Sequence, residues 1–116
     1  MALKIAGHLF NGPHDIDKTV VRANHRPVVY AVISKEGAPW DPQFRLIDVG
    51  CSEAGGIVFS EDAKNPQWRR DCKGTLCLFL LPMDEGGGYK ESDRSVIAER
   101  IRTLHRAPND LITIVH

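Results

Sequence analysis

The stretch "SVIAERIRTLHRAPND", residues 95–110, places a carboxylate, Glu99, among arginines on a predicted helix. Carboxylate oxygens are common ligands of divalent cations, so Glu99 is either a metal ligand or an ordinary solvated charge. Basic side chains give this helix a positive side; they are Arg94, Arg100, Arg102, His105 and Arg106. Arg94, Arg102 and Arg106 are therefore candidate nucleic-acid-binding residues, and Arg102 and Arg106, one turn apart, can meet two phosphates. A solvated helix face is the more ordinary interpretation of the same charges.

The overall charge limits how the chain can bind a partner. Its 116 residues include fifteen Lys and Arg and fifteen Asp and Glu. No net positive field would attract a phosphate backbone, so any binding of nucleic acid must come from a local patch. The length predicts a single domain, 1–116.

Several classes of protein are disfavoured by what the sequence contains. No apolar run approaches the roughly 20 residues of a membrane span, and the first residues do not resemble a secretory signal, so we expect a cytoplasmic protein without a membrane partner. Cys51, Cys72 and Cys77 are odd in number and form no CxxC pair, which indicates reduced thiols. No P-loop, nucleophile elbow or dinucleotide fingerprint occurs. The sequence does not determine an oligomeric state.

Three strand signals and one helix signal must position these side chains. "VVYAVIS", residues 28–34, is apolar throughout and rich in β-branched residues, which predicts a central strand covered on both faces. Residues 45–50 and 75–81 predict two further strands of the same sheet, because glycine and proline bound each of them. Residues 93–106 predict a helix that Pro108 ends.

The remaining segments give weaker signals. Residues 57–73 are expected to be irregular to helical, with Trp68 as an anchor into the core. Residues 110–115 predict a last strand. "KIAGHLF" near the N-terminus suggests an edge strand, and "DIDKTVVRAN" suggests a short helix. The expected fold class is therefore α+β, with helices packed against a small, mainly antiparallel sheet.

The second strand carries a specific expectation about its two faces. With the two-residue period of a regular strand, Leu46 and Asp48 share one face and Ile47 and Val49 share the other.

The paired strands bearing "VVY" and "DVG" resemble the "GIY" and "YIG" segments of the GIY-YIG endonuclease family. The last helix, with a glutamate followed by proline and asparagine, resembles the final motif of that family. The resemblance covers residues 27–110 and implies that residues 1–26 are an N-terminal extension of a single GIY-YIG-like domain. Each motif is short and altered. The resemblance implies a single Mg²⁺ or Mn²⁺ held by Glu99, tyrosines near the scissile phosphate, and an arginine that steadies the developing charge.

The resemblance assigns roles residue by residue. Tyr30 matches the tyrosine of the first motif and would place or deprotonate the attacking water, although a core aromatic is its ordinary alternative. Asp48 stands where the second motif has tyrosine; its carboxylate can bind a metal but repels a phosphate unless a metal intervenes. Gly50 matches the glycine that closes that motif, and an open backbone at a strand end would explain it equally well.

Two further positions depart from the family. Val58 stands at the place of the arginine that the family carries on the next helix, so Arg69 or Arg70 would have to replace it. A solvated face anchored by a tryptophan is the more common meaning of "WRRD". Asn109 matches the asparagine beyond the family's proline, or is simply a turn residue.

The phase of the last helix argues against Glu99 as a ligand. At about 100° per residue, Ile97, Ile101 and Leu104 lie on one stripe, and Glu99 lies roughly 200° from Ile97. We therefore predict that Glu99 faces solvent or an arginine, and that Ala98 fills the ligand position.

These observations predict a GIY-YIG-like nucleic-acid-acting domain that is at most a weak metal-dependent phosphodiester hydrolase. Mg²⁺ or Mn²⁺ would be its cofactor if it is active, with Tyr30, Asp48, Arg69 and Glu99 as catalytic candidates. The alternative is a non-catalytic module that keeps the fold and binds nucleic acid or protein, so the sequence leaves enzymatic activity open. A small-molecule enzyme that uses Asp48 and Cys51 is a third possibility.

Overall fold

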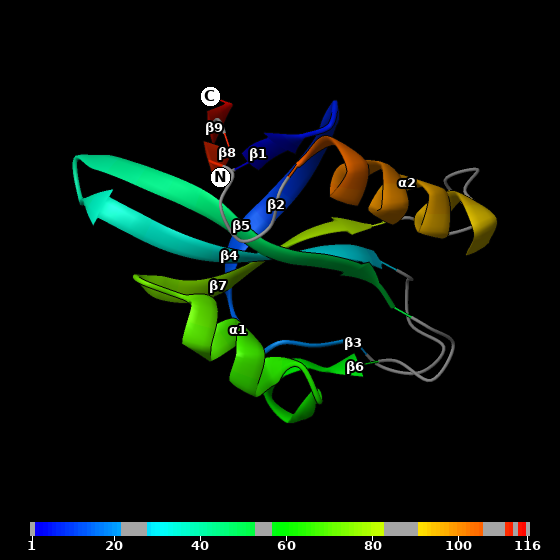
Figure 1. Ribbon diagram of the computed structural model, residues 1–116, viewed down its shortest axis with the longest axis horizontal. Coiled ribbons are helices and arrows are strands. Elements are labelled where there is room, and N and C mark those ends of the chain that lie inside the picture. Colours follow the sequence, from blue (N-terminus) through cyan, green and yellow to red (C-terminus); the bar gives the residue numbers. More distant parts are fainter. Residues whose placement is uncertain are drawn as a thin grey trace.

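A long antiparallel hairpin forms the middle of the molecule (Figure 1). The computed structural model describes residues 2–21, 28–52, 57–82, 91–105, 111–112 and 114–115. The strands are β1 (Ala2–Ile5), β2 (His8–Asp15), β3 (Val20–Val21), β4 (Val28–Ala38), β5 (Asp41–Cys51), β6 (Ile57–Val58), β7 (Thr75–Pro82), β8 (Leu111–Ile112) and β9 (Ile114–Val115). The helices are α1 (Asn65–Asp71) and α2 (Glu91–Leu104), and a 3₁₀ turn spans Phe59–Glu61.

The large sheet is antiparallel and has the strand order β8-β5-β4-β7-β2-β1-β9. β4 lies between β5 and β7, which confirms the central strand predicted from its apolar run. The three predicted strands all belong to this sheet, and the predicted helix is α2. β8 pairs with β5 and β9 pairs with β1, so these two short C-terminal strands are the outermost strands at the two ends of the sheet. The α+β class is therefore as expected.

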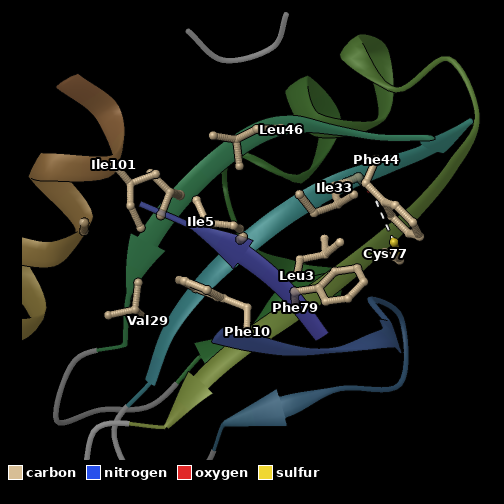
Figure 2. Close-up of a cluster of buried hydrophobic side chains, with 13 residues drawn as sticks. Leu3, Ile5, Phe10, Val29, Ile33, Phe44, Leu46, Cys77, Phe79 and Ile101 are labelled. Carbon is tan, nitrogen blue, oxygen red and sulfur yellow. Dashed lines mark hydrogen bonds between the residues drawn. The ribbon is translucent and has the colours of Figure 1, made fainter. Parts of the chain in front are cut away.

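A helix covers each face of the central strands. On the α2 side, Ala98 and Ile101 pack into a core whose other members are Leu3, Ile5, Phe10, Val29, Ala31, Ile33, Phe44, Leu46, Val49, Cys77 and Phe79 (Figure 2). On the α1 side, Trp68 is 1% exposed and anchors a second core that contains Tyr30, Val32 and Phe59. Neighbouring residues of β4 thus alternate between two buried cores, and this is why its sequence is apolar throughout.

A bulge in β5 overturns the expected alternation of its side chains. Val32 pairs with Asp48 and Ile33 pairs with Leu46, so one residue of β5 is extra between these pairs. A bulge places an additional residue in one strand and shifts the alternation that follows. Leu46 and Val49 therefore share the α2 face, while Ile47 belongs to the α1-side core and Asp48 bonds to a side chain of α1. The prediction that Leu46 and Asp48 share a face was wrong.

The N-terminal segment forms strands of the sheet. β1 and β2 make a hairpin whose turn residues, Ala6 and Gly7, have φ values of 50° and 85°. The short helix suggested over 15–24 is not formed by residues 15–21, which make a turn and β3; residues 22–24 lie outside the described residues. The Asp15 carboxylate accepts a hydrogen bond from the Asp17 N–H, and the Thr19 hydroxyl donates to the Asp15 carbonyl. Such local bonds offer the backbone an alternative to a helix.

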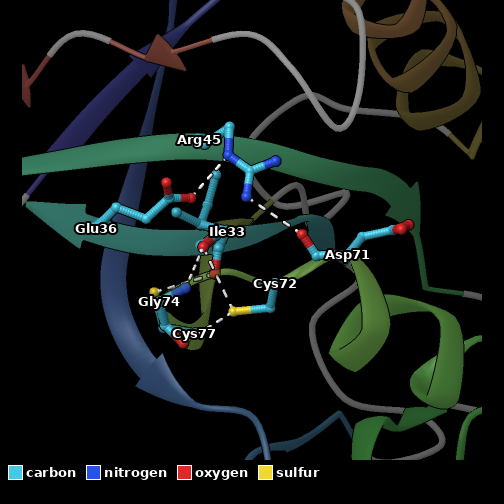
Figure 3. Close-up of polar contacts among 8 residues, drawn as sticks. Ile33, Glu36, Arg45, Asp71, Cys72, Gly74 and Cys77 are labelled. Atoms are coloured by element: carbon cyan, nitrogen blue, oxygen red, sulfur yellow. Dashed lines mark hydrogen bonds and ion pairs between the residues drawn. The ribbon is translucent and has the colours of Figure 1, made fainter.

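Polar contacts tie the end of α1 to the hairpin (Figure 3). Arg45 Nε donates to Glu36 Oε2 at 2.7 Å, and Arg45 Nη2 donates to the Asp71 carbonyl at 3.2 Å. The backbone N–H of Gly74 donates to Ser34 Oγ at 3.1 Å. These contacts fix α1 against the sheet. In the described part of the chain, neither helix is both long and apolar enough to cross a membrane.

Candidate functional site

The phenol of Tyr30 passes over Gly50 on the neighbouring strand. The two residues are paired across β4 and β5, and a Cβ added at Gly50 would lie 2.4 Å from Tyr30 Oη. The Tyr30 ring makes edge contacts with Phe59, at 5.0 Å between centroids, and with Trp68, at 6.3 Å. Gly50 is therefore required by the ring that crosses it, and the two motif positions are physically linked.

A cavity of about 410 Å³ lies where β4 begins and β5 ends. Four separate segments line it: Tyr30 from β4, Gly50, Cys51 and Ser52 at the end of β5, Ile57, Asp62 and Lys64 around the 3₁₀ turn, and Arg102 from α2. Among the described lining residues, the charged ones are two cations and one carboxylate. A cavity of this size and polarity can hold a small anionic group.

Arg102 is held at the cavity by contacts on both sides. Its Nη2 donates to the Val49 carbonyl at 2.8 Å, and its Nη1 pairs with Glu99 Oε2 at 2.9 Å. The Glu99 side chain is 72% exposed, whereas Ala98 is 1% exposed. Glu99 therefore faces solvent and an arginine, as the helix phase predicts. The prediction that Leu104 lies on the buried stripe was wrong, because this residue ends the helix and is 56% exposed.

Asp48 anchors α1 to β5. Its Oδ2 accepts a hydrogen bond from Trp68 Nε1 at 2.8 Å, and its Oδ1 accepts one from the Val49 N–H at 2.8 Å. The indole of Trp68 is buried, so this bond satisfies a donor that would otherwise be costly. Both carboxylate oxygens of Asp48 therefore already accept hydrogen bonds from the protein.

Burial is the main cause that raises the pKa of the Tyr30 phenol well above its ordinary value. The negative charges of Asp48 and Asp62 raise it further, and Arg102 opposes them. The phenol is therefore neutral near pH 7 and can donate a hydrogen bond. It is poorly suited to take a proton from water, which is the role that the family resemblance implies for it.

Arg69 and Arg94 are not among the residues that line this cavity. Arg69 donates to Asn65 Oδ1 at 2.7 Å and pairs with Asp17, and it lines a different cavity of about 460 Å³ beside β2 and β7. Arg94 is 8% exposed, so it does not belong to a solvated basic face. Arg106 and Asn109 lie outside the described residues.

Three polar residues that line the cavity, Ser52, Asp62 and Lys64, were not predicted from the sequence. Asp62 and Lys64 lie in the connection before α1, where Asp62 Oδ1 accepts a hydrogen bond from the Lys64 N–H at 2.8 Å. Ser52 follows β5, and its Oγ accepts a hydrogen bond from the Val28 N–H at 2.9 Å. No motif or spacing signalled them, because the fold alone brings these segments to Tyr30.

The described side chains do not form an evident metal centre. Within the ranges given above, no three His, Cys, Asp or Glu side chains lie close enough together to hold a metal ion.

Comparison with protein-family models, with curated proteins and with solved structures found no match for this chain.

Proposed function

We propose that this chain is a GIY-YIG-like domain that binds nucleic acid, with a backbone phosphate held in the cavity beside Tyr30. The observation that carries the proposal is that the start of β4 and the end of β5, which resemble the family's motifs, meet at one cavity lined by the Tyr30 phenol, Lys64 and Arg102. Phosphate contacts of this kind position a nucleic acid without reading its sequence.

The chemistry of the lining suits a phosphate group. Arg102 presents N–H donors from a guanidinium already oriented by the Val49 carbonyl, and a guanidinium matches phosphate oxygens well. Lys64 adds a second positive charge, and the neutral phenol of Tyr30 adds a third donor. These cations form the local patch that a chain of zero net charge needs for this purpose.

The same geometry supports weak catalysis at most. The Glu99 carboxylate is paired with Arg102, and both oxygens of Asp48 accept hydrogen bonds from groups that hold the fold together. The described donors therefore do not fit a tightly held Mg²⁺ or Mn²⁺, and binding a phosphate does not require one. Tyr30 acts as a hydrogen-bond donor in this proposal, not as a general base.

The binding proposal is tested by fluorescence anisotropy with labelled single-stranded and double-stranded DNA and RNA across a salt series. We expect Arg102→Ala to weaken binding about tenfold, or ~1.4 kcal/mol, and to reduce the salt slope by about one. Arg70→Ala is the matched control, because Arg70 is exposed on α1 and does not line the cavity. Equal affinity of the Arg102 and Arg70 variants would reject the cavity as the binding site.

Catalysis is tested separately with plasmid and single-stranded DNA in the presence of Mg²⁺ or Mn²⁺. We expect little cleavage by the wild-type protein. Cleavage that Glu99→Ala leaves unchanged would indicate a contaminating nuclease. Rapid cleavage that Glu99→Ala abolishes would show that the carboxylate leaves Arg102 to hold a cation. The domain would then be a metal-dependent nuclease.

One observation favours the alternative, a protein-interaction module. Trp40 is 86% exposed at the tip of the β4–β5 hairpin, beyond Lys35, the last residue of β4 that pairs with β7 (Figure 1). Exposed tryptophans are typical anchors of protein interfaces. Nucleic-acid affinity below detection, together with a partner whose binding is lost in Trp40→Ala, would favour this alternative.

A further inference from the structure

We propose that the Tyr30 cavity binds RNA in preference to DNA, because the Asp62 carboxylate accepts a hydrogen bond from the ribose 2′-hydroxyl beside the bound phosphate. This inference deepens the proposed function and rests on it. Among the described lining residues, Asp62 is the one whose charge opposes a phosphate.

The Asp62 carboxylate lies at the cavity, close to the donors that would hold a phosphate. Asp62 lines the same cavity as Tyr30, Lys64 and Arg102, and its negative charge is one of the causes that raise the pKa of the Tyr30 phenol. It directly follows the 3₁₀ turn, where its backbone N–H donates to the Phe59 carbonyl. Its Oδ1 accepts a hydrogen bond from the Lys64 N–H at 2.8 Å. The turn therefore fixes the carboxylate in place.

The cavity presents an unused acceptor and an unused donor. Asp62 Oδ2 has no hydrogen-bond donor among the residues that the structure describes. The same part of the chain holds no acceptor for the hydroxyl of Tyr30, a residue that is only 5% exposed. Because buried polar groups are usually paired, these groups favour a ligand that accepts from Tyr30 and donates to Asp62.

A phosphodiester by itself meets only half of this requirement. Its oxygens accept hydrogen bonds from the phenol and from Arg102, but they are acceptors only. Facing them, a carboxylate repels the phosphate unless a cation or a hydrogen-bond donor lies between the two charges. The ligand should therefore carry a donor directly beside its phosphate.

Ribose supplies that donor. In RNA the 2′-hydroxyl is on the carbon next to the one that carries the 3′-phosphate, and it can both donate and accept a hydrogen bond. Deoxyribose has no hydroxyl at this carbon, and the backbone within a DNA strand has no donor of its own. DNA would therefore leave Asp62 unpaired against the phosphate, whereas RNA would give the carboxylate a charge-assisted hydrogen bond.

The test compares oligo(U), oligo(dU) and 2′-O-methyl oligo(U) of equal length by fluorescence anisotropy, at one salt concentration and with EDTA present. Oligo(U) and oligo(dU) differ only in the 2′-hydroxyl, and methylation removes its donor while the ribose stays. We expect wild type to bind oligo(U) about tenfold more tightly than either of the other two, as a hydrogen bond to a charged group implies.

Asp62→Asn is the diagnostic variant, because it removes the charge and keeps an Oδ1 acceptor for the Lys64 N–H. It should bind oligo(dU) more tightly than wild type does, and its preference for oligo(U) should fall to about threefold, the effect of an uncharged hydrogen bond. Glu61→Gln is the matched control. It removes a neighbouring exposed carboxylate that is not among the described lining residues, and it should keep the preference of wild type.

The proposed function and this inference fail in different ways. Unchanged affinity of Arg102→Ala for oligo(U) would reject the phosphate site and the inference with it. Equal affinity of wild type for oligo(U) and oligo(dU), both weakened by Arg102→Ala, would keep the site and overturn the inference. A full preference in Asp62→Asn, or one that appears only when Mg²⁺ replaces EDTA, would also overturn it. Tighter binding of uridine 3′-monophosphate than of oligo(U) would do the same, because the ligand would then be a free nucleotide.

Discussion

Gly50→Ala tests the close approach on which the candidate site is built. The added Cβ would lie 2.4 Å from Tyr30 Oη and 2.6 Å from Cζ, far inside van der Waals contact. The ring cannot simply retreat, because Phe59 and Trp68 contact its other edges. Overpacking of this kind typically costs about 1–3 kcal/mol. For a domain of this length the cost corresponds to a fall in Tm of about 4–12 °C.

The assay is a double-mutant cycle read by thermal and urea unfolding. Tyr30→Leu removes the ring, so Gly50→Ala should cost much less in that background than in wild type. Gly7→Ala is the control, since Gly7 has a φ of 85° and nothing within 4 Å of an added Cβ, and its cost should be the same in both backgrounds. If Gly50→Ala costs the same with and without the Tyr30 ring, the glycine is required by the backbone and the inferred link is wrong.

Two titration predictions follow from burial. Tyr30 has a folded pKa above that of an unfolded tyrosine, about 10, so its stabilising contribution is complete below pH ~10 and is lost as the pH rises beyond that value. The Tm should fall more steeply between pH 9 and 11 in wild type than in Tyr30→Phe, and parallel curves would contradict this. Burial raises the pKa of the Cys77 thiol to about 11, so Cys77 should react more slowly with a disulfide reagent at pH 8 than the half-buried Cys51 and Cys72. Peptide mapping by mass spectrometry measures the order of labelling, and early labelling of Cys77 would show that its burial is not maintained in solution.

The main elements could be predicted because local composition and tertiary packing agree. The apolar run at 28–34 became the strand buried on both faces, and glycine and proline bounded its neighbours as expected. The hairpin of β4 and β5 nevertheless extends beyond the prediction. Pairing continues to Ala38 and Asp41, so the chain turns at Pro39 and Trp40. The positions of glycine and proline indicate that the chain turns between the two strands, but they do not determine how many residues pair before the turn.

The bulge in β5 was not predictable from its own residues. Regular alternation and a bulge place the same residues, "RLIDVG", on different faces of the sheet, and only their tertiary contacts decide between the two arrangements. Trp68 on α1 makes such a contact, because its buried indole N–H needs an acceptor and Asp48 provides one. The lining residues Asp62 and Lys64 were missed for a related reason, since segments far apart in sequence meet at Tyr30 only after the sheet has formed.

The phase of α2 also indicates on which side of the helix Arg94 lies. The same rotation of about 100° per residue that turns Glu99 toward solvent places Arg94 within roughly 40° of Ala98 and roughly 20° of Ile101. Arg94 was assigned to a basic surface because arginine is usually exposed, but its phase predicts the buried stripe in which the structure has it. A charged side chain in an apolar stripe is a conflict between local composition and fold, and predictions from residue type alone fail at such positions.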